Sequence, residues 1–561
     1  MVALTLASKL SQTSKKRVQR TIWRITRLAA FLLAGSIGFA VAADQANQNP
    51  TNQAPRITRE NGRYALLVDG EPFFMLCAQV HNSSGWPAML PKVWPAIERL
   101  HANTVQVPIA WEQIEATQGK FDFSFLDTLL TEARQHRVKL ILLWFGTWKN
   151  NGPNYAPEWL KLNNDRYPRV INSKGERLNS LSPHAAATLD ADRKAFTQLM
   201  RHLKQADPQH TVIMVQVQNE TGTYGSARDY SPLAQKVFEQ PVPAAARGAG
   251  GKSGNWSQVF GKDADEFFHA WHIASFVEQV AKAGKAEYDL PLYVNVALRD
   301  PFNPGPPGSY SSGGPTDNVL GLWKKAAPSI DLIVPDIYMP EYAKYVKVLD
   351  LYQRPDNALF VGEMGNAPVY ARYLFAVLGH QGIGFSPFGM DYTGYSNYPL
   401  GARKLDEETI EPFAMNYRLI APMSRLLASL SLRGKVHGVA EDPAEPHQQT
   451  LSLGRWQAAI SYGRPLFGNW DPPKGNPEPS GGALLAELGP DEFLVTGFHS
   501  RVDFSPANRS RGEKMQFARV EEGAYENGEW KFIRVWNGDQ TDWGLNFTSL
   551  PQVLRVRLAT Y

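Results

Sequence analysis

Eight short apolar runs, each ending in polar or aromatic residues, alternate along this chain with stretches of helical periodicity. Such alternation is typical of parallel strands joined by crossover helices. Eight repeats predict an α/β protein built on a (β/α)8 barrel, the TIM barrel, whose functional groups lie where the strands end. The expected strands are residues 73–80, 104–110, 139–145, 212–217, 292–298, 332–335, 359–362 and 383–388.

The clearest helical stretches carry an apolar residue every three or four positions and a charged opposite face. An open, doubly wound sheet would share this alternation and is the structural alternative, but no Gly-rich phosphate loop follows the first strand. The helical stretches are residues 91–100, 125–136, 193–205 and 264–283.

After residue 432 the pattern changes to short alternating runs separated by Gly, Pro and Asn turns. This change predicts a C-terminal β-sandwich domain over residues 433–561, after a barrel domain over residues 61–432. Whether the sandwich binds a ligand or only packs on the barrel stays open.

The first 42 residues are typical of a signal peptide. Seven basic residues and no acid precede an apolar stretch at residues 28–40, and Ala40-Val41-Ala42 gives a small-residue cleavage pattern. An uncleaved anchor helix is the alternative. Residues 43–60, rich in Gln, Asn and Pro at their start, are expected to form a disordered spacer. The chain is therefore expected to be exported, to the periplasm or the medium, with no membrane segment after cleavage.

Cleavage would also reverse the charge. The full chain carries 58 Lys and Arg against 54 Asp and Glu. Loss of the seven basic residues in the leader leaves 51 basic residues. The resulting slight negative charge argues against a nucleic-acid partner. Cys77 is the single cysteine, so an internal disulfide is excluded and a packed core must hold the fold.

Two acidic residues stand where apolar strands end. Glu220 follows the run at residues 212–217, and Glu363 comes directly after Gly362, the last residue of the run at 359–362. A lone Glu at a strand end is usually a surface residue. Two in matched positions inside this repeat predict a lined cleft, because burying an unpaired charge is costly. Glycoside hydrolysis needs such a pair, one carboxyl protonated and the other ionised.

Aromatic and amide side chains near the strand ends suit a sugar ligand. Aromatic rings cover the apolar face of a sugar ring, and amide and ammonium groups bond its hydroxyls. Packing in the core is the alternative for each aromatic residue. The sequence shows no His or Cys cluster at metal spacing, so no metal or cofactor is expected, and it shows no Gly-x-Ser-x-Gly turn to support a serine nucleophile. The candidate binding residues are Trp111, Trp148, Lys149, Asn150, Asn219 and Tyr338.

The segment 215–224, Val-Gln-Val-Gln-Asn-Glu-Thr-Gly-Thr-Tyr, resembles the Asn-Glu signature of glycoside hydrolase family 35, the β-galactosidases. The region from Trp94 to Phe123 is similar to the second-strand region of that family and of its relative, family 42. The resemblance spans roughly residues 65–430. It implies a retaining mechanism with Glu220 as acid/base and Glu363 as nucleophile.

The resemblance also implies that Asn219 bonds the sugar 2-hydroxyl and that Tyr338 bonds the nucleophile. The chain departs from the animal and fungal pattern at Pro108, where those enzymes commonly have a tyrosine, and at residues 145–151, where they supply a sugar-binding glutamate. The region looks more like a bacterial subgroup associated with trimming β-galactose from plant cell-wall polysaccharides such as xyloglucan.

Two other functions stay open at this point. One is a β-glucosidase, β-mannanase or other glycanase on the same barrel, and the other is an exported sugar-binding protein without turnover. The long segments 221–262 and 299–317 both follow predicted strands, so they are expected to shape the mouth of the barrel unless they are disordered insertions.

Overall fold

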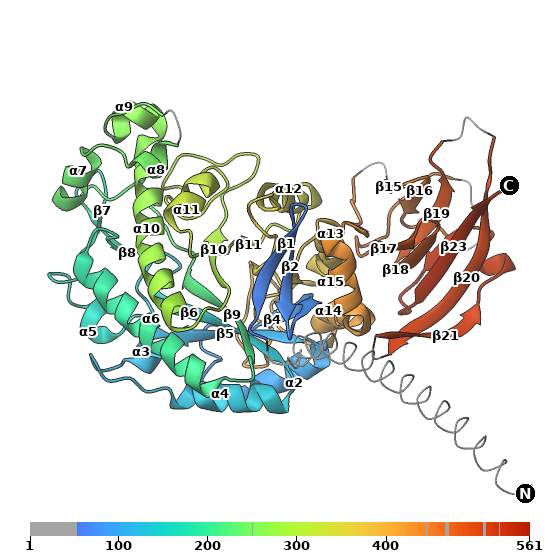
Figure 1. Ribbon diagram of the computed structural model, residues 1–561, viewed down its shortest axis with the longest axis horizontal. Helices are drawn as coiled ribbons and strands as arrows, with labels where there is room; N and C mark the ends of the chain where they lie inside the picture. The colour runs from blue at the N-terminus through green and yellow to red at the C-terminus, as the bar shows by residue number, and fades with distance from the viewer. Residues whose placement is uncertain (1–52, 249–250, 445–446, 466–470, 509–511, 527) are drawn as a thin grey trace, which may run out of the picture. The chain divides into compact units, whose positions relative to one another are not determined.

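A computed structural model describes residues 53–248, 251–444, 447–465, 471–508, 512–526 and 528–561 (Figure 1). Eight parallel strands form one sheet in the order β12-β11-β10-β9-β6-β5-β4-β13. Their bounds are β4 (Met75–Gln79), β5 (Thr104–Ala110), β6 (Lys139–Lys149), β9 (Val212–Asn219), β10 (Leu292–Ala297), β11 (Leu332–Ile337), β12 (Glu363–Met364) and β13 (Gly384–Phe385).

The sheet closes on itself. β13 pairs in parallel with β4, and an isolated parallel bridge joins Val361 to Phe385. The predicted (β/α)8 barrel is therefore confirmed, and the open-sheet alternative does not hold. One strand differs from expectation in its bounds: β12 begins at Glu363, after the predicted residues 359–362. Those residues still bond both neighbours, with Val361 N donating to Gly384 O (3.2 Å) and Gly362 N donating to Pro335 O (3.3 Å).

The four helices expected from periodicity are present, and three are longer than predicted, one of them by a single residue. Further helices lie between the strands in both halves of the barrel. The predicted four are α2 (Leu90–Leu100), α4 (Ser124–Gln135), α6 (Ala186–Ala206) and α10 (Ala264–Glu287). The others between barrel strands include α3 (Trp111–Ile114), α5 (Glu158–Lys161), α7 (Pro232–Phe238), α8 (Ala244–Arg247), α9 (Trp256–Phe260), α11 (Leu320–Ala326), α12 (Tyr342–Tyr352) and α13 (Tyr373–Gly379).

A small antiparallel sheet precedes the barrel. It contains β1 (Arg56–Glu60), β2 (Arg63–Val68) and β3 (Glu71–Phe73), so the predicted spacer extends too far at its C-terminal end. Residues 56–60 pair with β2 in an antiparallel ladder, and Ile57 of β1 packs against the core, which explains their regular structure. The predicted signal peptide lies outside the described residues. Within the described part of the chain, no helix has the length and apolar character needed to cross a bilayer.

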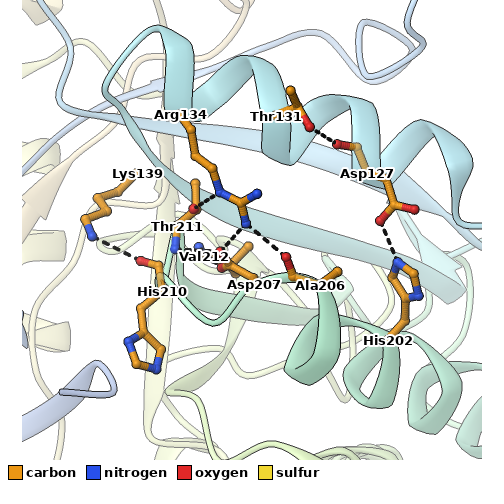
Figure 2. A network of polar contacts seen from close by, with 10 residues as sticks. All are labelled: Asp127, Thr131, Arg134, Lys139, His202, Ala206, Asp207, His210, Thr211 and Val212. Carbon is orange, nitrogen blue, oxygen red and sulfur yellow. Dashed lines mark hydrogen bonds and ion pairs between the residues drawn. The ribbon is translucent and has the colours of Figure 1, made fainter. Parts of the chain in front are cut away.

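Polar side chains pin the amino-terminal end of the barrel strands (Figure 2). Asp207 is fully buried and accepts hydrogen bonds from Thr211 N (3.0 Å), Val212 N (2.7 Å) and Arg134 Nη2 (2.7 Å). Lys139 Nζ donates to the carbonyl oxygen of His210 (3.1 Å). These contacts satisfy the backbone where β6 and β9 begin, as a buried strand end requires.

Strands beyond the barrel form two further sheets, after α14 (Glu407–Ile420) and α15 (Ser424–Leu432). Their inner faces share one hydrophobic core that includes Trp456, Phe493 and Val556, the arrangement of a β-sandwich. The six-stranded sheet contains β14 (Val436–Ala440), β17 (Gly482–Gly489), β18 (Glu492–Phe498), β20 (Met515–Glu526), β21 (Glu529–Val535) and β23 (Val553–Thr560). The four-stranded sheet contains β15 (Gln448–Leu453), β16 (Trp456–Ser461), β19 (Ser500–Pro506) and β22 (Leu545–Phe547).

Candidate active site

Three carboxyl groups meet at the carboxyl ends of the barrel strands. Glu220 follows β9, Asp336 lies in β11 and Glu363 begins β12. One oxygen atom of each group lies within 4.8 Å of those of the other two. The sheet register produces this cluster, because Asp336 and Glu363 are direct partners in the parallel ladder. Glu220 and Glu363, predicted from separate motifs, are therefore brought together, and Asp336 joins them.

Glu363 is surrounded by hydrogen-bond donors. Its Oε1 accepts from Gln79 Nε2 (2.9 Å), Asn219 Nδ2 (3.3 Å) and Asn295 Nδ2 (3.4 Å), and its Oε2 accepts from Tyr338 OH (2.9 Å). These four donors can compensate a negative charge on the Glu363 carboxyl group, which suits it to act as a nucleophile.

Glu220 is held by its backbone in a sparsely populated conformation. Its φ is +46°, in the left-handed region that costs a non-glycine residue about 1 kcal/mol or more. Asn295 Oδ1 accepts from Glu220 N (2.9 Å), and Asn151 Nδ2 donates to Glu220 O (2.7 Å). These two side chains fix the peptide units on each side of Glu220 and thereby aim its carboxyl group.

The electrostatics separate the two predicted catalytic groups. Burial, followed by the charge of Glu363, raises the pKa of Glu220 to about 7, against the opposing effects of Lys149 and of a hydrogen bond with Asp336. An acid with this pKa is largely protonated at and below neutral pH, as general-acid catalysis requires. Glu220 is therefore suited to donate a proton, while the donors around Glu363 suit it to hold a charge.

A cavity of about 400 Å³ opens above these carboxyl groups. Five of the residues predicted from sequence line it: Glu220, Glu363, Lys149, Asn150 and Tyr338. Asn219, which was also predicted, is fully buried and donates to Glu363. Asn82, Tyr224 and Leu298 add walls from three further loops.

Trp111 and Trp148 do not line the cavity, which corrects the expectation that they bind sugar. Both are 0% exposed and belong to the main hydrophobic core. Trp111 Nε1 donates to Glu115 Oε2 (2.7 Å), and Trp148 packs against Phe276 of α10. Side chains alternate along a strand, so Lys149 facing the cavity directs Trp148 to the helical layer.

A second cavity, of about 240 Å³, adjoins the first and shares Asn82 and Phe388 with it. Its walls include the rings of Tyr155 and Tyr395, the latter 69% exposed, together with small polar side chains. Such a lining combines ring faces with hydroxyl and amide partners, the chemistry that binds carbohydrates.

The long segments expected at the barrel mouth do contact each other there. Thr223 and Ser312 form an antiparallel bridge, with Thr223 N donating to Ser312 O (2.9 Å). Because Tyr224 of the first segment lines the cavity, these segments form part of the site rather than a detached insertion.

Sequence reasoning missed Asp336 and Gln79. Asp336 lies one residue beyond the predicted strand 332–335, the same signal that identified Glu220 and Glu363, so it could have been found. Gln79 gave no such signal, because it lies inside an apolar strand and its role depends on Glu363, 284 positions away.

A closed eight-stranded barrel with a buried carboxylate cluster at its carboxyl end is the class of structure that these observations define. Comparison with known proteins agrees with the predicted enzyme class. Residues 87–272 match the glycoside hydrolase family 42 model, described as beta-galactosidase, and residues 413–548 match a domain of unknown function.

A beta-galactosidase of Xanthomonas manihotis is 29% identical over 219 residues, which are 36% of this chain and 32% of that protein. The chain thus matches about a third of that relative's length. Solved beta-galactosidases of Bacillus circulans sp. alkalophilus (12% identity, 63% of this chain and 57% of that one, TM-score 0.47) and Marinomonas ef1 (13%, 64% and 62%, 0.47) are also similar. Similarity to beta-galactosidases is therefore found, but the predicted assignment to family 35 is not confirmed, because the matching model is that of family 42.

Proposed function

We propose that this protein is a retaining exo-β-galactosidase that removes terminal β-galactosyl residues by double displacement. The carboxylate spacing carries the proposal: Glu220 and Glu363 have oxygens within 4.8 Å of each other. Retaining enzymes hold their two carboxyl groups about 5–5.5 Å apart, whereas inverting enzymes leave about 6.5–9.5 Å for a water molecule. The matching family model supports the choice of galactose.

In the first step, Glu363 attacks the anomeric carbon and the glycosidic C–O bond breaks. Glu220 gives its proton to the departing oxygen, which leaves as an alcohol. In the second step, the Glu220 carboxylate takes a proton from water, the resulting hydroxide oxygen attacks the anomeric carbon, and the ester to Glu363 breaks. Both residues return to their starting protonation states.

The surroundings of Asn219 support this assignment. Its Nδ2 contacts Glu363, while its Oδ1 is buried and meets no hydrogen-bond donor among the described residues. An acceptor beside the nucleophile is suited to a sugar hydroxyl, and the family resemblance assigns that hydroxyl to carbon 2.

The second cavity supports a branched or polymeric substrate. A ring bound against Tyr395 and Tyr155 would lie next to the sugar at the carboxylates, so the two cavities could hold two neighbouring rings of a cell-wall oligosaccharide such as a xyloglucan fragment. The basic leader followed by an apolar stretch supports export to the periplasm or medium, where such substrates occur.

The test is a panel of nitrophenyl β-glycosides of galactose, glucose, mannose and xylose, with Glu363→Ala assayed in parallel. We expect release from the galactoside that is lost in Glu363→Ala and partly restored by azide, which replaces the missing nucleophile. Release from another sugar alone would overturn the galactose assignment, and wild-type activity in Glu363→Ala would overturn the mechanism. Silence on every glycoside would favour a binding protein.

A second assay separates the acid role of Glu220 from a binding role. Glu220→Ala should lose far more activity on an alkyl or sugar leaving group than on nitrophenol, because nitrophenolate departs without protonation. Equal losses on both substrates would count against general-acid catalysis by Glu220.

A further inference from the structure

Asp336 is the carboxyl group of the cluster to which the mechanism above gives no role. It is 3% exposed and lies beside Glu363 in the sheet. Its Oδ2 accepts a hydrogen bond from Asn295 Nδ2 (2.7 Å). Its Oδ1 is buried, and no N–H or O–H group of the described residues donates to it. An ionised carboxylate with one bare buried oxygen would be strongly destabilised.

The surrounding charges oppose a second anion. Carboxyl groups reach Asp336 from β12 and from the residue after β9, and the phenols that face it from the residue after β11 and from β10 are neutral. Within the described residues, a single lysine on β6 supplies the positive charge that acts on the cluster. The groups concerned are Glu363, Glu220, Tyr338, Tyr293 and Lys149.

These groups divide the charge unequally. Glu363 has four donors and therefore holds the negative charge most easily, as described above. Burial, followed by the charges of Glu363 and Glu220, raises the pKa of Asp336 well above its usual range. One oxygen of Asp336 lies within 4.8 Å of one oxygen of Glu220, and Oδ1 of Asp336 has no donor among the described residues, so a hydrogen on Oδ1 would find an acceptor in this neighbouring carboxyl group.

We propose that Asp336 is a positioning residue that remains protonated and donates its Oδ1 hydrogen to the carboxyl group of Glu220. This inference rests on the proposed function. When Glu220 gives its proton to the departing oxygen, the new carboxylate accepts the Asp336 hydrogen more strongly than the neutral acid did. Asp336 keeps its proton throughout, so the step adds no proton and removes none, and it stabilises Glu220 in the form that next activates water.

Two substitutions separate a neutral donor from a charged neighbour. Asp336→Asn preserves both contacts, because its Oδ1 can accept from Asn295 and its Nδ2 can donate to Glu220. Asp336→Ala removes the donor. We expect Asp336→Asn to keep kcat/KM within about threefold of wild type, and Asp336→Ala to lose about tenfold to a hundredfold on poor leaving groups.

The pH profile supplies a readout that a merely structural role would not move in this way. Loss of the donor raises the pKa of Glu220, so the alkaline limb of kcat/KM should shift to higher pH in Asp336→Ala and stay in place in Asp336→Asn. If Asp336 were ionised, both substitutions would remove a negative charge, and the limb would shift to lower pH in each. That result would overturn the proposal.

An infrared difference spectrum between wild type and Asp336→Asn at pH 7 tests the protonation state without turnover. We expect wild type to show a carbonyl band of a protonated carboxylic acid that the Asn variant lacks. Only carboxylate bands in the difference would overturn the proposal, even in an active enzyme. If wild type cleaves no glycoside but shows the protonated band, the galactosidase assignment fails while the protonated Asp336 stands.

Discussion

Asp207 at the amino-terminal end of the barrel accepts hydrogen bonds from Arg134 and two backbone N–H groups, whereas Asp336 at the carboxyl end meets two other carboxyl groups and has an oxygen without a donor. Both side chains are buried at ends of the same sheet. Hydrogen-bond donors compensate the charge of Asp207, whereas Asp336 shares a small volume with two other carboxyl groups. Crowding buried carboxyl groups without donors costs stability, so their presence marks the end of the barrel where chemistry takes place.

Substitution of the nucleophile should have the largest effect on activity and should not lower stability. We expect Glu363→Gln to lower kcat/KM by about a thousandfold or more, because the covalent step is lost. The melting temperature should stay equal to or above that of wild type, since a buried charge leaves the cluster. Calorimetry on the same preparation checks this, and a lower melting temperature would contradict the comparison.

At the amino-terminal end of the barrel, Asp207→Ala should lower stability without lowering activity. It leaves Arg134 and two backbone N–H groups without their acceptor, which should cost about 3 kcal/mol of unfolding free energy. Urea unfolding measures this loss. The kcat of the folded fraction should equal that of wild type, and Asp127→Ala on α4 is the matched control, since its carboxyl is exposed and pairs with His202 at the surface. A large fall in kcat for Asp207→Ala would show that the two ends are coupled.

The raised pKa of Glu220 predicts a pH-dependent stability. A carboxyl with a folded pKa of about 7 binds its proton more tightly in the folded than in the unfolded state. It therefore stabilises the fold at low pH, and that contribution is lost as pH rises from about 4.5 through 7. Glu220→Gln should raise the melting temperature more at pH 8 than at pH 5. An increase of the same size at both values would mean that the folded pKa is not raised.

The smallest effect is expected at the second cavity. Tyr395→Ala should raise KM for a xyloglucan-derived oligosaccharide by about fivefold, the effect of roughly 1 kcal/mol of ring stacking, and leave KM for nitrophenyl galactoside unchanged. Tyr392→Ala is the matched control, because Tyr392 lies in the same loop outside both cavities. Equal KM changes for the two substrates would remove the second cavity from the binding site.

The two ends of the barrel also differ in how far sequence could predict them. Apolar runs and helical periodicity predicted all eight strands, because a parallel strand that is buried on both faces is a continuous apolar run in the sequence. Glu220 and Glu363 were predictable because each interrupts that composition. The start of the regular β12 ladder at Glu363 rather than at residue 359 was not predictable, since the pairing of this segment depends on how the sheet closes between β11 and β13.

Side-chain direction was the other limit. Trp111 and Trp148 stand at strand ends, yet both face the helices, and one residue of register separates Trp148 from Lys149 in the cavity. A sequence shows that a residue is near a strand end but not which side of the barrel wall it faces. Asp207 was unpredictable for a related reason, because its partner Arg134 comes from another helix.

Cys77 gives the folded barrel a built-in reporter. It is the chain's one cysteine, it lies in the middle of β4 with 0% exposure, and burial raises the pKa of its thiol well above the usual range. A thiol reagent can reach it only when β4 leaves the sheet, so the rate of labelling counts opening events of the barrel itself. The cysteine of a Tyr395→Cys variant would be labelled at once. Comparing its labelling rate with that of Cys77 would separate motion at the cavity mouth from opening of the barrel.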